Sequence, residues 1–246
     1  MGEGMLALRG NRKEIAAWYF IALLLSIAVE GEGGTANPFH FFFLILISTL
    51  LMLLAIKLFA PILIRRLLFV LELAFLTLAF AYLLSSFSLP WYLSIVAPIV
   101  RITAGERAEN ASVAVIAGVL AGLVGKGMHP GDAALLLSIT AVYDFIAVFI
   151  TGHMKTIARA VSPSFSEGPV SSDRYSLGSG DVALPAVMAS AAFKAAPVVG
   201  MVSTLAAMVG LVLLFVYVSR KPGILPALPF IAFPQLMMYV LLSYLR

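Results

Sequence analysis

The stretch AALLLSITAVYDFIAVFI, which runs from Ala133 to Ile150, decides the fold of this chain. It is apolar and long enough to cross a bilayer as a helix, and Asp144 is the one ionisable carboxylate within it. A carboxylate at membrane depth costs about 2.5–3.5 kcal/mol on insertion scales, so it marks a functional site by default. A second acid, Asp181, follows Gly178-Ser179-Gly180 at the start of another apolar stretch. We therefore expect two membrane helices that bring one aspartate each to a shared site.

The composition indicates a polytopic membrane protein with a single membrane domain over residues 1–246. Hydrophobic residues make up 62% of the chain and charged residues only 11%. The chain has no cysteine, which excludes disulfides, thiolate nucleophiles and Cys-ligated metals. The three histidines, His40, His129 and His153, show no ligand spacing, so we expect no metal and no cofactor. The net charge is +4, and the basic residues flank apolar runs. This placement favours a role for them in membrane topology over a role in nucleic-acid binding.

The apolar runs predict an all-α fold with nine transmembrane helices. Spans one to six fill about 13–154, residues 155–176 form a polar loop, and spans seven to nine fill 177–246. The first run ends in Glu30-Gly31-Glu32 rather than in a small-residue cleavage site, so we expect it to be retained as a span. The expected spans are 15–29, 39–59, 67–84, 91–102, 111–124, 133–153, 177–193, 198–218 and 226–245.

The distribution of basic residues predicts the orientation of these spans. With the N-terminus inside, the inner segments hold all but three of the 16 Lys and Arg residues, the exceptions being Lys126, Lys194 and Arg246. The positive-inside rule therefore predicts a cytoplasmic N-terminus, a cytoplasmic 155–176 loop and an outer C-terminus. Gly118 and Gly122 form a small-xxx-small face that would allow close helix packing.

The positions of the two aspartates in their spans predict that they meet. Asp144 precedes Lys155 by about 16 Å of helix, and Asp181 follows Arg174 by about 10 Å. Two adjacent carboxylates cannot both ionise cheaply, so the pair should hold one proton. The ionised member could then activate a water, and the protonated member could polarise a peptide carbonyl.

Helix breakers surround both acids and suggest how water reaches this depth. Gly178, Gly180 and Pro185 interrupt span seven, and Pro226 and Pro229 open span nine. Irregular backbone at membrane depth is tolerated where protein buries it or water reaches it. The many small residues after Asp181 suit a central helix packed by neighbours.

Three short motifs, in this order, resemble the signatures of the presenilin and signal peptide peptidase family. They are Tyr143-Asp144, Gly178-Ser179-Gly180-Asp181 and Pro226-Ala227-Leu228, similar to the family's YD, GxGD and PAL motifs. The resemblance implies an intramembrane aspartyl protease with Asp144 and Asp181 as the catalytic pair. It implies that Pro226, Ala227 and Leu228 shape the site and help to hold substrate. The chain departs from the family at Ser179, where leucine is usual, which puts cleavage preference in question.

The resemblance also implies substrates, partners and location. The substrates would be single membrane helices, which must unwind locally before they can be cut. The exposed backbone could pair as a strand with the segment before Gly178 or with Pro226-Ala227. On this basis Leu228→Lys is expected to abolish cleavage and leave the fold intact. The chain is similar to an archaeal homologue in a prokaryotic cell membrane, its partners being the bilayer and helical substrates; oligomerisation stays open.

Several further residues have alternative interpretations. The hydroxyl of Tyr143 could tune the adjacent acid, or its ring could simply pack. Glu72 in span three is interpreted as structural, either paired with a basic residue at a span end or lining a water path. Gln235 is interpreted as a hydrogen-bonding packing residue. His129 and Asp132 are expected to be solvated in an outer loop.

Other classes of protein use similar residues. Type IV prepilin peptidases also carry a GxGD aspartate in a membrane helix, but they lack the PAL motif. A proton-coupled transporter or channel could use two membrane aspartates as a relay, although no inverted repeat is visible. A factor that binds membrane helices without cutting them is the third alternative.

Overall fold

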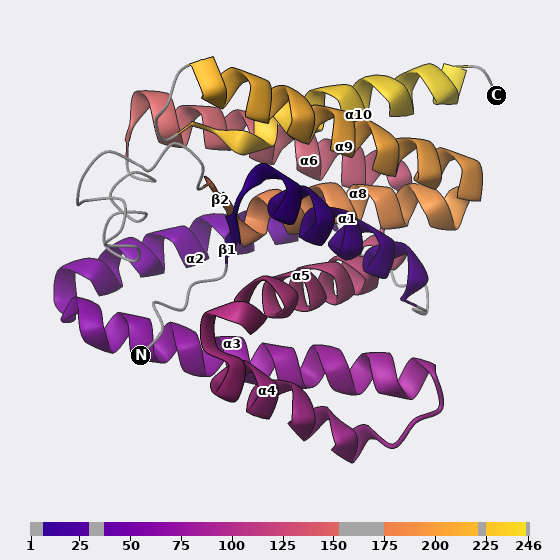
Figure 1. Cartoon of the computed structure of the whole chain (residues 1–246). Helices are drawn as coiled ribbons and strands as arrows, with labels where there is room; N and C mark the ends of the chain where they lie inside the picture. Colours follow the sequence, from indigo (N-terminus) through magenta and orange to yellow (C-terminus); the bar gives the residue numbers. More distant parts are fainter. Residues whose placement is uncertain (1–6, 30–36, 153–174, 221–224, 245–246) are drawn as a thin grey trace.

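The computed structural model describes residues 7–29, 37–152, 175–220 and 225–244, and this part of the chain is built from nine α-helices. Two short strands and three short helical segments join them (Figure 1). The helices are α1 Arg12–Ala28, α2 Pro38–Leu58, α3 Pro61–Ser86, α4 Val96–Ala104, α5 Glu109–Lys126, α6 Pro130–Phe145, α8 Ser179–Ala195, α9 Pro197–Arg220 and α10 Ala227–Tyr244. The other elements are β1 Ala7–Gly10, β2 Tyr175–Gly178, η1 Trp91–Ile95, η2 Gly105–Ala108 and the π-helical turn η3 Ile146–Ile150.

The helix boundaries follow from residues that satisfy the first backbone N–H groups. Asn11 caps α1 through a capping box, in which its side chain and that of Glu14 bond each other's backbone N–H. Proline opens α2 and α6, where its missing N–H costs nothing. The expectation of an all-α fold is confirmed. The expected loop at 155–176 lies mostly outside the described residues.

Six of the helical segments are long and apolar enough to cross a membrane, so the chain is a multi-pass membrane protein. They are Pro38–Leu58, Ile62–Ser86, Glu109–Lys126, Pro130–Ile150, Pro197–Arg220 and Ala227–Tyr244. The segment Trp91–Ala104 is apolar but shorter, and α1 and α8 have 17 residues each. Nine crossings and their orientation therefore stay predictions.

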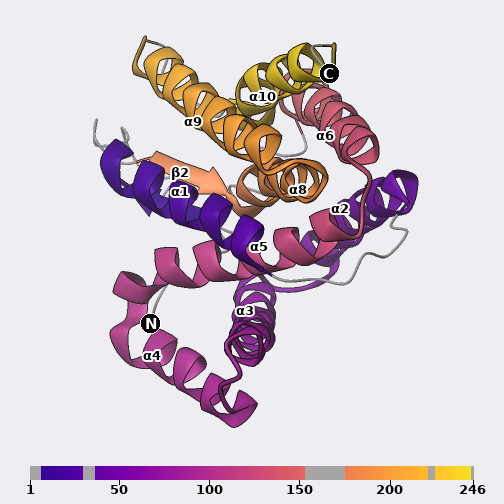
Figure 2. The ribbon, with the colours of Figure 1, turned by 90° about the vertical axis from the view of Figure 1, so that its right-hand side faces the viewer.

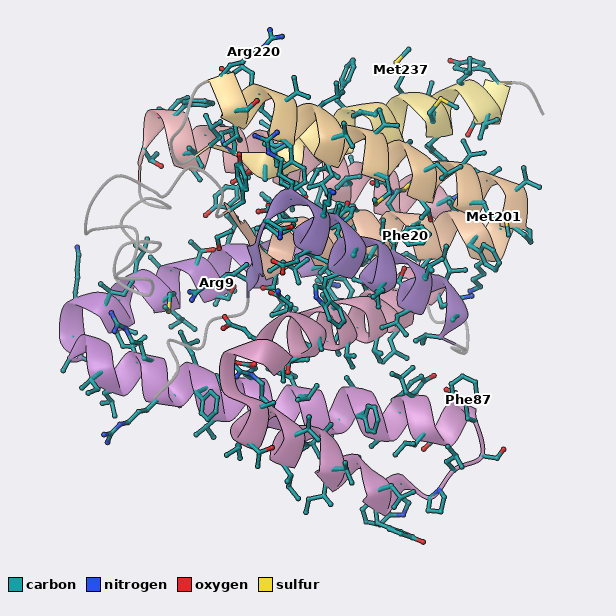
Figure 3. The ribbon with its side chains drawn as sticks, viewed as in Figure 1. Arg9, Phe20, Phe87, Met201, Arg220 and Met237 are labelled. Atoms are coloured by element: carbon teal, nitrogen blue, oxygen red, sulfur yellow. The ribbon has the colours of Figure 1, made fainter. Side chains whose placement is uncertain are left out.

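The helices lie alongside one another, and their ends gather at two opposite ends of the bundle. The start of α1 and the end of α10 lie toward opposite ends (Figure 1). In Figure 3, Arg9 and Arg220 lie toward one end, and Phe87 and Met201 lie toward the other. The two labelled arginines thus lie at the end of the bundle opposite Phe87 and Met201.

Helix α8 forms the centre of the bundle. It packs against α1, α5, α6 and α9, and nearly every residue from Val182 to Ala192 is buried or half-buried. The close packing depends on glycines of α5. A Cβ on Gly118 would lie 2.6 Å from the carbonyl oxygen of Ala22 on α1, and one on Gly125 would lie 2.5 Å from that of Val187 on α8. The small-residue face of α5 therefore joins α1 to α8.

Helices α3 and α4 form a separate arm that an ion pair holds together. Figure 2 shows this arm on the far side of α5 from α9 and α10. The Arg101 Nε lies 2.6 Å from Glu72 Oε1, with both side chains buried, and Arg101 also donates to the Gly105 carbonyl at 2.7 Å. Glu72 is thus paired with a basic residue near a span end, in agreement with the structural interpretation.

A two-stranded antiparallel sheet lies where α8 begins, and the sequence did not predict it. Strand β1 pairs with β2 so that Ala7 faces Gly178 and Gly10 faces Tyr175. The outer edge of β1 is satisfied by Asn110 of α5, whose Oδ1 accepts the Arg9 N–H at 2.7 Å and whose Nδ2 donates to the Arg9 carbonyl at 2.6 Å. The sheet fixes the backbone that enters α8.

Candidate functional site

Asp144 lies in the last turn of α6, immediately before the π-helical turn η3. Its side chain is half-buried, and its Oδ2 accepts a hydrogen bond from the backbone N–H of Leu228 at 3.3 Å. That N–H belongs to the first turn of α10, where helix geometry leaves donors without an intrahelical partner. The carboxylate of Asp144 therefore helps to cap α10 and is fixed by it. A π turn at this point is typical of functional sites in helices.

Asp181 is the third residue of α8 and is held by the start of its own helix. Gly178 is the N-cap residue, and its backbone N–H hydrogen-bonds to the Asp181 carboxylate. This is one half of a capping box, and the N-terminal position is favourable for a negative charge. A Cβ on Gly178 would lie 3.2 Å from Asp181 Oδ2. The glycine therefore leaves room for the carboxylate to fold back.

The fold brings the two acids together from separate helices. Helix α6 packs against both α8 and α10. Asp144 and Asp181 lie close enough for their charges to interact. Each of them takes one backbone N–H from the start of a helix, Asp144 from α10 and Asp181 from α8. Two like charges in one partly buried site favour a state in which the pair binds one proton.

The other motif residues surround this pair. Ser179 and Gly180 form the first turn of α8, and a Cβ on Gly180 would meet no atom within 4 Å. Pro226 and Ala227 are buried at the start of α10. Leu228 has only 2% of its surface exposed. Leu228→Lys would therefore place a charge in a buried position, so we now expect this variant to disturb the fold as well as cleavage.

The structure gives roles to three further residues that the sequence left open or interpreted as structural. The ring of Tyr143 packs edge-on against Phe42 of α2, with centroids 6.2 Å apart, which supports the packing interpretation for the ring. His129 is the N-cap residue of α6, because its Nδ1 accepts the Gly131 N–H at 3.2 Å. With Asp132 and Lys194 it lines a cavity of about 870 Å³ at the end of α6 remote from Asp144. Gln235 donates to the Pro185 carbonyl and to Ser203 Oγ, as a packing residue would.

No cluster of three or more His, Cys, Asp or Glu residues that could hold a metal ion occurs within the described ranges. The acid–base groups that this site offers are the carboxyl groups of Asp144 and Asp181.

One residue near the site was missed by sequence reasoning. Tyr19 of α1 is fully buried and lies close enough to Asp181 to interact with its charge. Its only sequence signal is a hydroxyl in a mostly apolar run, which is common in membrane helices.

Comparisons with known proteins agree on the fold. No family model and no curated protein matches the chain. Two solved structures, each described as a presenilin family intramembrane aspartate protease, match over nearly the full length. The match to the structure in space group C222 has a TM-score of 0.73 at 17% sequence identity and includes 96% of this chain and 99% of the other. The match to the structure in space group P2 has a TM-score of 0.68 at 19% sequence identity and includes 94% of this chain and 97% of the other. The chain thus has the fold of a presenilin family protease.

Proposed function

We propose that this chain is an intramembrane aspartyl endopeptidase that hydrolyses peptide bonds within transmembrane helices of other proteins. The observation that supports the proposal is that Asp144 of α6 and Asp181 of α8 lie within range of each other's charge, in a chain whose fold matches that of a solved presenilin family intramembrane aspartate protease. The same fold match favours this reading over a prepilin peptidase or a transporter.

The pair would act through one shared proton. The ionised carboxylate takes a proton from a water, and the water oxygen bonds to the carbon of the peptide carbonyl. The protonated carboxyl donates its proton to the carbonyl oxygen at the same time. In the resulting tetrahedral intermediate, the carboxyl that took the proton from water gives it to the nitrogen as the C–N bond breaks, and the other carboxylate takes a proton from a hydroxyl of the intermediate. The dyad thereby returns to its starting one-proton state, and the products are a new carboxylic acid, which then ionises, and a new amine.

The two backbone donors would hold the carboxylates in place for these transfers. The Leu228 N–H orients Asp144 and the Gly178 N–H orients Asp181, so each acid has one donor that belongs to the backbone. Because both donors are helix N-terminal amides, they are fixed by secondary structure before substrate binds. In this reading Pro226 and Ala227 shape the site by fixing where α10 begins, and Ser179 lies where it can affect cleavage preference.

Strand β2 offers a means of holding an unwound substrate. A helix hides its amides, so the segment to be cut must open and find other partners for its backbone. In the described part of the chain β2 pairs with β1 alone, on one edge. The second edge of β2 leads directly into Gly178 and Asp181, so a substrate strand added there would pass beside the acids. The partners would thus be single helices delivered through the bilayer.

The experiment is reconstitution of the purified chain in lipid vesicles with a reporter that has one transmembrane helix. The wild type should produce two fragments whose new ends map within the helix by mass spectrometry. Asp144→Ala and Asp181→Ala should each reduce the rate at least 1,000-fold, on the order expected when a dyad loses one member. A matched assay of proton flux tests the transporter alternative: flux without any fragments would overturn the proposal.

A further inference from the structure

The buried stripe of α1 carries a hydroxyl that its packing does not need. Ile15, Tyr19, Ala22, Leu23 and Ser26 form this stripe, and Tyr19 is its largest member, with 0% of its surface exposed. Among the residues that the structure describes, the Tyr19 hydroxyl has no hydrogen-bond partner. A buried hydroxyl left unpaired costs roughly 1–3 kcal/mol, so a phenylalanine would fill the same space at less cost. Packing alone does not explain an unpaired buried donor of this kind, so a functional role should be considered.

The position of Tyr19 supplies that explanation. Helix α1 packs against α8 and against β2, which are the two elements that meet at Gly178. Tyr19 shares one hydrophobic core with Leu177 and Val182, the residues that bracket the Gly-Ser-Gly-Asp segment. Its hydroxyl lies within electrostatic range of Asp181. Asp181 is therefore within charge range of Asp144 on α6 and of the Tyr19 phenol on α1, and it accepts the backbone N–H of Gly178.

We propose that Tyr19 is a positioning residue whose hydroxyl donates a hydrogen bond to the Asp181 carboxylate in the working site. The proposal rests on the proposed function and extends it, because it assigns α1 a part in the chemistry. The donor holds Asp181 in the rotamer that faces Asp144, and it stabilises the ionised form of the carboxylate. A hydrogen bond to a charged group is stronger than one between neutral groups. We therefore expect the loss of this hydrogen bond to lower the rate of the chemical step.

The test is Tyr19→Phe in vesicles with the helical reporter, which removes the hydroxyl and keeps the ring. We expect kcat to fall roughly 10- to 100-fold with KM unchanged, as for a lost charge-assisted hydrogen bond. The acidic limb of the pH–rate profile should move to higher pH, because an ionised carboxylate without its donor takes up a proton more readily. Thermal stability should be unchanged or higher, because the variant no longer buries an unpaired hydroxyl.

Tyr239→Phe is the matched control. The Tyr239 hydroxyl of α10 lies 3.9 Å from the Cβ position of Gly131, at the end of α6 remote from Asp144, so its loss should leave kcat and the pH profile as in the wild type. A Tyr19→Phe variant with wild-type kcat and an unmoved acidic limb would overturn the proposal. So would a loss of kcat that follows a loss of thermal stability while the pH profile stays fixed. The proposed function itself fails separately, if the wild type does not cut or Asp181→Ala still does.

Discussion

Each acidic side chain of the candidate site accepts a hydrogen bond from a backbone amide. Asp144 accepts the N–H of Leu228, and Asp181 accepts the N–H of Gly178. Each amide belongs to a helix start, where several donors have no partner within the helix. The arrangement therefore couples the orientation of each carboxylate to the exact place where a helix begins. Small changes at these helix starts should affect chemistry before they affect stability.

The two glycines before Asp181 allow a matched test of this idea. A methyl group on Gly178 would lie 3.2 Å from Asp181 Oδ2 and must displace the carboxylate by a few tenths of an ångström. A methyl group on Gly180 would meet nothing within 4 Å, and neither glycine has a positive φ. We expect Gly178→Ala to lower kcat about 10-fold or more, because misplaced reacting groups are costly. Gly180→Ala should keep most of the activity and should stabilise α8 by up to about 1 kcal/mol.

Reporter cleavage at saturating substrate measures kcat for both variants, and thermal unfolding in detergent measures their stability. Equal rates for Gly178→Ala and the wild type would contradict the view that the glycine makes room for the carboxylate.

Elements far apart in the sequence cooperate at the entrance to α8. Strand β1 comes from the N-terminal part of the chain, β2 directly precedes the Gly-Ser-Gly-Asp segment, and α5 supplies the amide that completes the outer edge of β1. At the start of α1, Arg12 adds hydrogen bonds of 2.7 and 3.0 Å to the Tyr175 hydroxyl. The strand beside the site is therefore anchored from two sides.

Asn110→Ala tests this anchoring. The change removes both side-chain hydrogen bonds to Arg9 and leaves an unpaired strand edge, so β1 should pair less stably with β2. We expect cleavage to slow several-fold and the backbone amides of β2 to exchange hydrogen faster, with helix content unchanged by circular dichroism. Ser48→Ala is the control, since that hydroxyl bonds only within α2, to the carbonyl of Ile45. Protection of β2 amides equal to that of the wild type would speak against the anchoring role.

The ion pair in the α3–α4 arm gives a prediction about stability alone. Glu72 and Arg101 are almost fully buried. Removal of one partner would leave the other charge buried and unpaired, which should lower the free energy of unfolding by about 3–5 kcal/mol. Glu72→Gln or Arg101→Met should each lower the melting temperature strongly, and the double variant should recover much of the loss. The pair lies in the separate arm, so cleavage per folded molecule should change little. A double variant as unstable as the sum of the single variants would contradict this coupling.

At the scale of the whole molecule, the sequence predicted the helices and the two acids but not how the helices pack. Apolar runs and Pro or Gly boundaries determine where helices begin and end, and Asp144 and Asp181 stood out because charge is rare in such runs. The β1–β2 sheet was not predictable, because Ala7–Gly10 is too short and mixed to carry a pattern. Tyr19 was not predictable either, since its meaning depends on what α1 faces. The burial of Leu228 was not predictable for the same reason, because it depends on how the helices pack.

Topology is the other property of the whole molecule that needs a measurement. Because the sequence contains no cysteine, a single introduced cysteine provides the sole thiol for labelling. Ala195→Cys and Ser219→Cys place thiols at exposed positions near the two ends of α9. With nine crossings and an inner N-terminus, a membrane-impermeant maleimide should label the first from outside and the second only after the membrane is opened. The reverse pattern would overturn the predicted orientation.

The central claim is that two membrane carboxylates share one proton and together cut a peptide bond. The most direct test is the pH dependence of kcat/KM for the helical reporter, measured for the wild type beside Asp144→Asn and Asp181→Asn from about pH 4 to about pH 9, on either side of the one-proton state. The account predicts a bell-shaped profile for the wild type, because both the doubly protonated and the doubly ionised pair are inactive, and no cleavage by either asparagine variant at any pH. A wild-type profile with a single limb, or an asparagine variant that cuts at the wild-type rate, would contradict it.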